Sequence, residues 1–250
     1  MYFDSEPIND EDRICYGSDD GNEVHGSLTR IDQLQLGVFD VDGTLREKRD
    51  PWIHLHEHLG FVEEAHEHAR MFHDGEIGYE EWVDRDAALW KGFHRLEILA
   101  ALETNPLKAG AEELLAWFAE NKIPIVGIST GLDIFNLPVA ERFGFRLMRS
   151  NELHFDENGV CLGRATIHVR EDGKGRILDS VLAELGIEGN SIVALGDGSA
   201  DIQLFERAAL SIAVSPSKQK IRDAADRCIE DGRIDFAAIQ YIKEAFRMRD

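Results

Sequence analysis

The sequence predicts an α/β fold with a doubly wound parallel sheet, and three observations lead to this fold class. Four short apolar runs, rich in β-branched residues, alternate with amphipathic helical patterns. Runs of that kind are typical of parallel strands that helices cover on both faces. Asp40, Ser129 and Asp197 lie at the ends of three of the runs, and folds of this class place their sites at the carboxyl ends of the strands. A long block without any strand pattern follows the first run, which predicts an inserted group of helices.

The predicted strands cover residues 34–40, 122–130, 191–198 and 210–215. Because helical patterns intervene between these runs, the strands are expected to lie parallel in one sheet. The predicted helices of the sheet domain cover residues 110–121, 175–186, 201–208 and 218–225. Residues 151–170 contain the turn sequence ENG between two apolar stretches, which predicts a small β-hairpin flap.

The block that follows the first strand has the pattern of three or four amphipathic helices. It interrupts the connection from the first strand to the first helix, so we expect a helical cap over the site. The predicted domains are a core of residues 34–46 and 107–246 and a cap of residues 47–106. Residues 1–33 are rich in acidic residues, Gly and Ser, which predicts a disordered tail.

Composition excludes several classes of protein. The formal net charge of −21 argues against a nucleic-acid backbone or an anionic membrane surface as a partner. Cys15, Cys161 and Cys228 are widely spaced, so we expect neither a disulfide framework nor a zinc site. No apolar stretch is long enough to span a bilayer, and no secretory signal pattern is visible. We therefore expect a soluble cytoplasmic protein.

Two aspartates, Asp40 and Asp42, directly follow the first apolar run in the stretch FDVDGTL. Side chains two residues apart on a strand share one face. Two carboxylates packed that closely repel each other, and burial makes the repulsion stronger. Something must compensate such a pair, and a bound cation is the commonest device, so the pattern raises the expectation of a cation at the end of the first strand.

Four strings carry a resemblance to a known family. FDVDGTL, ISTG, DGKG and GDGSAD occur in the order and rough spacing of the haloacid dehalogenase-like superfamily of phosphatases. The chain resembles this family from about Leu34 to about Ile242, and it is closest to the phosphoserine-phosphatase-like branch with its helical C1-type cap. Each string alone is an ordinary turn pattern, but four in order at strand ends or helix starts are specific. The resemblance implies a Rossmann-like core and phosphoryl-transfer chemistry.

The resemblance also assigns roles to the acidic residues. Asp40 would be the nucleophile that forms an aspartyl-phosphate, and Asp42 would be the general acid and base. Asp40, the backbone carbonyl of Asp42 and Asp197 would be the protein ligands of an oxygen-only Mg2+ site. Asp201, one helical turn further along, would contact the metal through water or through another ligand.

The phosphate-binding residues follow from the remaining motifs. Lys174 would place a cation on the phosphoryl oxygens and offset the cluster of carboxylates. Ser129 and the backbone N–H of Thr130 would hold a phosphoryl oxygen, and Gly131 would let the chain turn closely there.

The residues expected to recognise the rest of the substrate depart from the family pattern. In phosphoserine phosphatases a Glu at the start of the cap accepts the substrate ammonium, and a cap Arg pairs with its carboxylate. An ungapped alignment puts Arg49 and Asp86 at those positions, with Glu47 and Arg85 nearby if the register shifts. Ala200 also replaces an amide residue of the last motif. The resemblance therefore predicts that phosphoserine is a poor substrate.

These patterns predict a Mg2+-dependent phosphomonoester hydrolase that acts through an aspartyl-phosphate on a small phosphorylated metabolite. Three alternatives stay open: a phosphotransferase that passes the phosphoryl group to an alcohol, a true phosphoserine phosphatase, and a non-catalytic binding protein that kept the fold. The sequence leaves the oligomeric state open, with a homodimer as one alternative. His54 and His58 lie one helical turn apart but lack further metal ligands. Three tryptophans are expected to pack the core of the cap: Trp52, Trp82 and Trp90. One of the three is also a candidate to line the substrate pocket.

Overall fold

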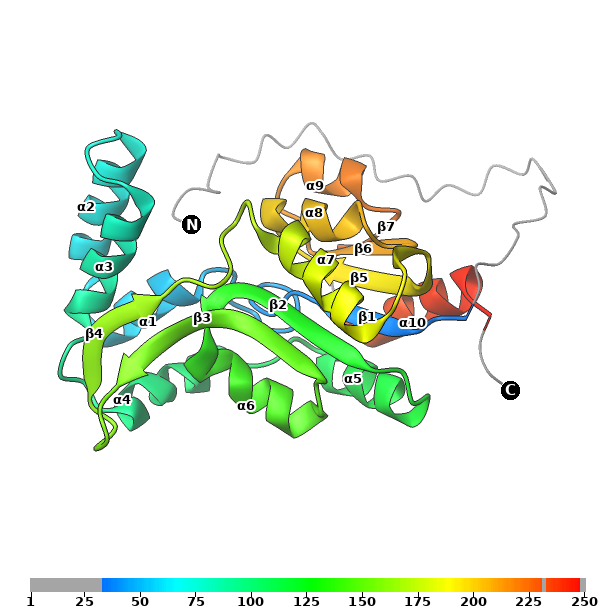
Figure 1. The fold of residues 1–250 in the computed structure, drawn as a ribbon, viewed down its shortest axis with the longest axis horizontal. Helices are drawn as coiled ribbons and strands as arrows, with labels where there is room; N and C mark the ends of the chain where they lie inside the picture. Colours follow the sequence, from blue (N-terminus) through cyan, green and yellow to red (C-terminus); the bar gives the residue numbers. More distant parts are fainter. Residues whose placement is uncertain (1–32, 231–232, 248–250) are drawn as a thin grey trace.

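The computed structural model describes residues 33–230 and 233–247. The predicted tail therefore lies outside the described residues except for Gln33, and so does Cys15. Seven strands of the described chain form one sheet in the order β4-β3-β2-β1-β5-β6-β7 (Figure 1). These strands are β1 (Leu36–Phe39), β2 (Ile125–Leu132), β3 (Leu147–Phe155), β4 (Cys161–Thr166), β5 (Ile192–Gly196), β6 (Leu210–Val214) and β7 (Arg227–Ile229).

Every neighbouring pair of strands is parallel except β3 and β4, which are antiparallel. β1 pairs with β2 on one side and with β5 on the other, so its carboxyl end lies in the middle of the sheet. Residues that follow β1 are therefore flanked by those that follow β2 and β5. The predicted α/β fold with a doubly wound sheet is confirmed.

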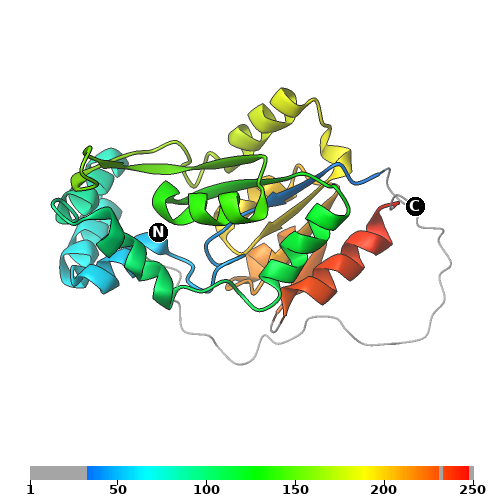
Figure 2. The same ribbon diagram turned by 90° about the horizontal axis from the view of Figure 1, so that it is seen from below.

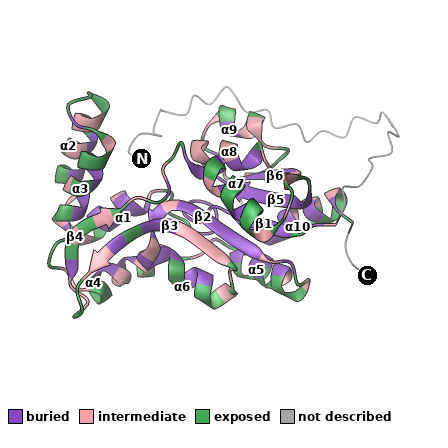
Figure 3. Ribbon diagram, in the orientation of Figure 1, coloured by how far each residue is buried: buried purple, intermediate pink, exposed green. Residues whose placement is uncertain are grey.

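Helices cover the two faces of the sheet, and the alternation of side chains in β1 shows how. Leu36 and Val38 pack with α7, α8 and α9, whereas Phe39 packs on the opposite face with α5 and α10. Figure 3 shows the strands of the core buried between these layers. The covering helices are α5 (Ala111–Glu120), α7 (Lys174–Leu185), α8 (Ile202–Phe205), α9 (Gln219–Ala224) and α10 (Ile234–Ala245). Short 3-10 turns are η2 (Gly189–Ser191) and η3 (Ser199–Asp201).

The block between β1 and α5 is helical, as predicted. It contains α1 (Pro51–Leu59), α2 (Val62–His73), α3 (Tyr79–Leu89), α4 (Arg95–Ala100) and the 3-10 turn η1 (Ala101–Thr104). We call residues 51–104 the helical segment. Figures 1 and 2 place α2 and α3 at one end of the molecule. No helix within 33–230 or 233–247 is both long and apolar enough to cross a membrane.

The helical segment packs on the sheet domain through an apolar cluster. Trp52 and Trp90 lie 5.1 Å apart between ring centroids, and both are buried with Leu132 of β2 and Phe135 of α6 (Asp133–Phe143). Trp82 is buried in a smaller cluster between α2 and α3. All three tryptophans thus pack in apolar clusters. The exact boundary between core and cap stays a prediction.

The predicted hairpin is present, but it is continuous with the main sheet. β3 starts at Leu147, ahead of the predicted range, and pairs parallel with β2 before it pairs antiparallel with β4. In the turn, Asp156 accepts hydrogen bonds from the backbone N–H groups of Asn158 and Val160, and Gly159 has a φ of 80°. The sequence patterns missed the first half of β3, because Arg149 interrupts its apolar run, and all of β7, which is three residues long and begins with Arg227.

The packing around β1 generates a prediction of stability. Phe118 of α5 is fully buried and meets Phe39 edge to face, with 5.3 Å between the ring centroids. Phe118→Ala should lower the free energy of unfolding by about 3–5 kcal/mol, because it removes buried apolar area and leaves a cavity. Chemical denaturation would measure this, with Phe236→Ala as a control, since Phe236 is 73% exposed. Equal effects of the two substitutions would contradict the burial of Phe118.

Candidate active site

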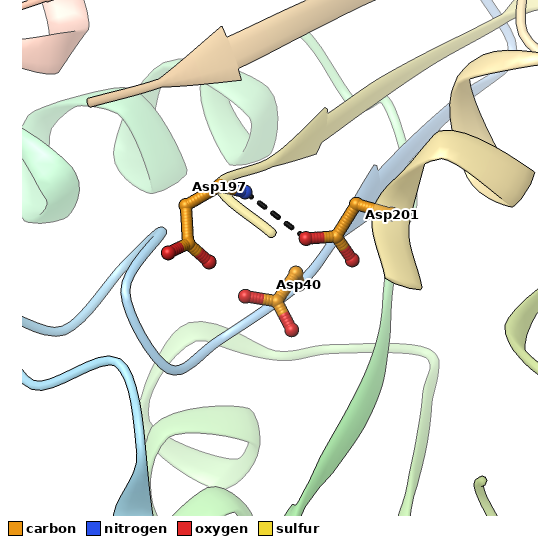
Figure 4. Close-up of side chains that lie close together, drawn as sticks. All are labelled: Asp40, Asp197 and Asp201. Carbon is orange, nitrogen blue, oxygen red and sulfur yellow. Dashed lines mark hydrogen bonds between the residues drawn. The ribbon is translucent and has the colours of Figure 1, made fainter. Parts of the chain in front are cut away.

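The carboxyl ends of β1 and β5 bring the predicted acidic residues together. Asp40 follows β1, Asp197 follows β5, and Asp201 ends the turn η3. One carboxylate oxygen from each lies within 4.8 Å of the others, and all three side chains are buried. Figure 4 shows the three carboxyl groups gathered at this point. Because all the donors are oxygens, the group suits a hard divalent cation such as Mg2+.

Lys174 links two of these carboxylates. Its ammonium lies 2.7 Å from Asp40 Oδ1 and 2.6 Å from Asp201 Oδ1, and the side chain is 3% exposed. Burial lowers the pKa of Lys174, but attraction by the two carboxylates outweighs burial and raises it above its usual value. Lys174 therefore stays charged, and it places a fixed positive charge beside Asp40. The lysine stands at the first position of α7, which orients it toward the strand ends.

Asp40 is held by a second donor on its other oxygen. Thr44 Oγ1 donates to Asp40 Oδ2 at 2.8 Å, so each carboxylate oxygen has a separate partner. Burial, opposed by Lys174 and reinforced by repulsion from Asp201, raises the pKa of Asp40 to about 6. Near neutral pH this carboxyl group is ionised, oriented and shielded from bulk water. Such a group is suited to nucleophilic attack.

Asp42 has one satisfied and one unsatisfied oxygen. Ser129 Oγ donates to Asp42 Oδ2 at 3.1 Å, whereas the buried Oδ1 has no hydrogen-bond partner within the described residues. Burial and the nearby Asp40 raise the pKa of Asp42 to about 7. A carboxyl group that titrates near neutral pH is suited to general acid and base catalysis.

Asp201 organises the loop that follows β5. Its Oδ2 accepts hydrogen bonds from the backbone N–H of Asp197 at 3.0 Å (Figure 4) and from that of Gly198 at 2.9 Å. Its Oδ1 contacts Lys174, so both oxygens already have partners. This arrangement is consistent with an indirect contact between Asp201 and a metal. Burial, together with repulsion by Asp40 and Asp201, raises the pKa of Asp197 well above its usual value.

Glycines let the loops approach these side chains. A Cβ on Gly43 would lie 2.3 Å from Asp197 Oδ2, and one on Gly131 would lie 2.3 Å from Asp42 Oδ2. Gly43 also has a φ of 89°, which favours glycine. The Gly131 N–H donates to Ser129 Oγ at 2.8 Å, which fixes that hydroxyl beside Asp42. Thr130 lies between Ser129 and Gly131 in β2.

Sequence patterns missed Asn151, a fully buried residue of β3. Its Nδ2 donates to the backbone oxygens of Thr130 and Val169, at 2.8 and 3.2 Å. Its Oδ1 accepts from the N–H groups of His168 and Val169. Asn151 therefore ties the end of β2 to the chain that leads to Lys174. The only available signal was an Asn inside a strand, where Asn is disfavoured.

The four positions considered for substrate recognition lie in different surroundings. Arg49 reaches the site, with Nη1 2.8 Å from Asp197 Oδ2. Asp86 is buried in α3 and contacts His68 Nδ1 at 2.7 Å and His56 Nε2 at 3.7 Å. Arg85 pairs with Glu81 on the surface of α3, and Glu47 is exposed. Of the four, Arg49 is the residue in contact with the acidic cluster.

His54 is buried and bonds the backbone oxygen of Ala101 through Nε2 at 2.9 Å, whereas His58 is exposed. Over residues 33–230 and 233–247, the one group with the geometry to hold a metal is the Asp40, Asp197 and Asp201 cluster.

Comparisons with known proteins point to one family. The family model for haloacid dehalogenase-like hydrolase matches residues 35–209. The phosphoserine phosphatase of Archaeoglobus fulgidus is 30% identical over 220 residues, which are 87% of this chain and 63% of that protein. That of Albidiferax ferrireducens is 30% identical and covers 82% of this chain and 89% of its own length. That of Campylobacter jejuni is 28% identical, with shares of 79% and 94%.

Solved structures agree with these sequence matches. A phosphoserine phosphatase with a phospho-aspartyl intermediate analogue is 25% identical, with a TM-score of 0.68, and covers 86% of this chain and all of that one. A probable phosphoserine phosphatase from Vibrio cholerae has a TM-score of 0.74 at 20% identity, over 87% of this chain and 68% of that one. At 20% identity, the similarity to the Vibrio cholerae structure shows the fold alone.

The raised pKa of Asp42 predicts how the stability of the metal-free protein varies with pH. Folded Asp42 has a pKa of about 7, against 3.8 for an ordinary Asp. Between these values the folded state holds the proton that the unfolded chain releases, so stability falls as pH rises. Asp42→Asn removes this contribution of Asp42 to the pH dependence of stability. Melting in EDTA at about pH 5 and pH 8 should show the variant gaining several degrees on wild type at the higher pH. An equal difference in melting temperature between variant and wild type at the two pH values would contradict the raised pKa of Asp42.

Proposed function

The chain belongs to the haloacid dehalogenase-like hydrolase family and is an enzyme of the phosphatase class; we propose that it hydrolyses small phosphomonoesters through a phosphorylated Asp40, with Mg2+ as cofactor. One observation supports this most strongly. Asp40 is buried at the end of β1 with its two oxygens held separately by Lys174 and Thr44. A carboxylate fixed in this way is prepared for in-line attack on phosphorus.

In the proposed first step, an oxygen of Asp40 forms a bond to phosphorus as the bond from phosphorus to the leaving alcohol breaks. Protonated Asp42 gives its proton to the leaving oxygen, so the alcohol departs neutral. In the second step Asp42 takes a proton from water, the water oxygen attacks phosphorus, and the bond to Asp40 breaks. Inorganic phosphate is released and both aspartates return to their starting states. The pKa of about 7 supports this double role for Asp42.

Lys174, Ser129, Thr130 and Gly131 are the proposed phosphate-binding residues. Lys174 already carries a fixed charge beside Asp40, and the Ser129 hydroxyl lies next to Asp42. In this role the ammonium of Lys174 neutralises charge on the phosphoryl oxygens. Ser129 Oγ and the backbone N–H of Thr130 orient the phosphoryl group against the Asp40 carboxylate.

Asp40, Asp42 through its backbone oxygen, and Asp197 would hold Mg2+, with Asp201 in an indirect contact. The clustering of three buried carboxylates and the unpartnered Asp42 Oδ1 fit a site that needs further positive charge. When bound, Mg2+ supplies charge neutralisation for the phosphoryl oxygens.

Phosphoserine hydrolysis is the second candidate, because the relatives that match most of the chain bear that name. Arg49 beside Asp197 favours substrates without an ammonium group instead. We further propose that the helical segment is the core of the predicted cap over the site. Phosphate release to water would separate hydrolysis from the alternative of a phosphotransferase. Localisation in the cytoplasm stays a prediction.

Asp40→Asn tests the nucleophile. The amide is nearly isosteric but a poor nucleophile, so phosphate release from a generic aryl phosphate should fall by about 1,000-fold or more. Asp223→Asn, at an exposed position, is the control and should keep full activity. Thermal melting should show both variants folded. Turnover of Asp40→Asn within tenfold of wild type would exclude the covalent mechanism.

Removal and return of metal test the proposed cofactor. Activity should be lost in EDTA and return with Mg2+. Saturating Mg2+ should also raise the melting temperature by about 5 °C or more, because the ion binds only the folded cluster. Asp197→Asn should abolish this shift, whereas Asp223→Asn should keep it. A metal-free sample with full activity would refute the Mg2+ site.

A further inference from the structure

Arg49 carries a positive charge at the site, and it has no role in the proposed phosphoryl transfer. Its Nη1 contacts Asp197 Oδ2 at 2.8 Å, and its Nη2 donates to the backbone oxygen of Ser215, which follows β6. The Arg49 side chain is 39% exposed, whereas that of Asp197 is 7% exposed. The guanidinium therefore lies on the solvent side of the buried carboxylates.

A second cation meets the same residue. Lys108 Nζ lies 3.5 Å from Ser215 Oγ, and Lys108 is half-buried. Arg49 precedes the helical segment and Lys108 follows it, so the two linkers of that segment each bring a positive charge to Ser215. Ser215 itself has a φ of 46°, an unusual backbone conformation for a residue other than glycine. Its two oxygens thus bring two cations together, and one of them, Arg49, contacts Asp197.

Binding of a divalent cation would change the partners of Arg49. Asp197 is a proposed metal ligand, and a metal ion repels a guanidinium that shares its carboxylate. The Ser215 backbone oxygen would still hold Arg49 near the site. A guanidinium has five N–H donors in a planar fork, which matches a carboxylate or a phosphate. Arg49 would then lack an anionic partner on the solvent side of the acidic cluster.

We propose that Arg49, assisted by Lys108, binds an acidic group on the alcohol portion of the substrate. The substrate class is phosphomonoesters of small alcohols that carry a carboxylate or a second phosphate. This inference rests on the proposed phosphomonoester hydrolysis and names the substrate class for the same site. An ammonium group at that place would face two like charges and would weaken binding. Arg49 is thus a specificity-determining residue.

Three matched phosphonates test this assignment by binding alone. In 3-phosphonopropionate, propylphosphonate and 3-aminopropylphosphonate the far end is an acid, a methyl group and an ammonium, and the C–P bond resists hydrolysis. Isothermal titration calorimetry of the full chain, with and without Mg2+, gives their affinities. Arg49→Gln is the test variant. Arg149→Gln is the matched control, since Arg149 is 41% exposed and contacts Glu184 at 3.3 Å.

Wild type and Arg149→Gln should bind 3-phosphonopropionate about tenfold more tightly than propylphosphonate in the presence of Mg2+. Arg49→Gln should reduce this ratio to about twofold or less while binding propylphosphonate as wild type does. The amino compound should bind no more tightly than propylphosphonate. An equal affinity for acid and methyl compounds in wild type, or a ratio that survives Arg49→Gln, would overturn the proposal. So would a ratio that Arg85→Gln removes and Arg49→Gln leaves.

Phosphate release separates this proposal from the proposed function. Phosphoglycolate and ethyl phosphate are the cleavable counterparts of the acid and methyl compounds. Release from both, with no preference in phosphonate binding, would overturn the role of Arg49 and keep the phosphatase. A binding preference without any release would keep the role of Arg49 and refute the hydrolysis of these esters.

Discussion

The site depends on one constraint: four buried aspartates share a small volume at the carboxyl ends of β1 and β5. Burial alone would drive such groups to take up protons, because a charge in a low-dielectric interior is costly. Lys174 and Arg49 offset part of this cost through direct contacts with Asp40, Asp201 and Asp197. The surrounding fold positions the residues that make these contacts. β1 lies in the centre of the sheet, and Gly43 leaves room for the Asp197 carboxylate.

The sequence was sufficient to predict that Asp40 and Asp197 follow β1 and β5, and parallel pairing places these two strand ends together. The second strand was predicted to end near Ser129, but β2 continues to Leu132, so Ser129 lies inside it. The contacts of Lys174 with Asp201 could not be predicted, because they depend on how the chain returns from β4 to α7. Arg149 and Arg227 prevented the prediction of the first half of β3 and of β7, because a charged residue breaks the apolar pattern expected of a strand. Their charges lie in strands toward the two sides of the sheet, where water remains within reach.

Hydrogen bonds from residues without an assigned role hold the proposed reacting groups in place. Asn151 connects the end of β2 to residues 168 and 169, and Thr44, which lies within FDVDGTL, joins Asp40 to Asp197 at 2.8 and 3.5 Å. The importance of Asn151 comes from register, which fixes whether a side chain reaches its neighbour. The motifs thus identify the proposed reacting groups, whereas the orientation of those groups depends on residues to which the motifs assign no role.

The two linkers of the helical segment run side by side where they leave the sheet domain. The Glu47 N–H donates to the Pro106 oxygen at 3.1 Å, the Lys108 N–H donates to the Leu45 oxygen at 2.8 Å, and buried Arg46 bonds the Asn105 oxygen at 2.7 Å. For the sheet, the whole segment is therefore an excursion that starts and finishes at one point. The entropy of closing such an excursion grows only slowly with its length. Helical segments of different size and sequence can accordingly be exchanged between these two linkers while the strands of the sheet keep their pairing.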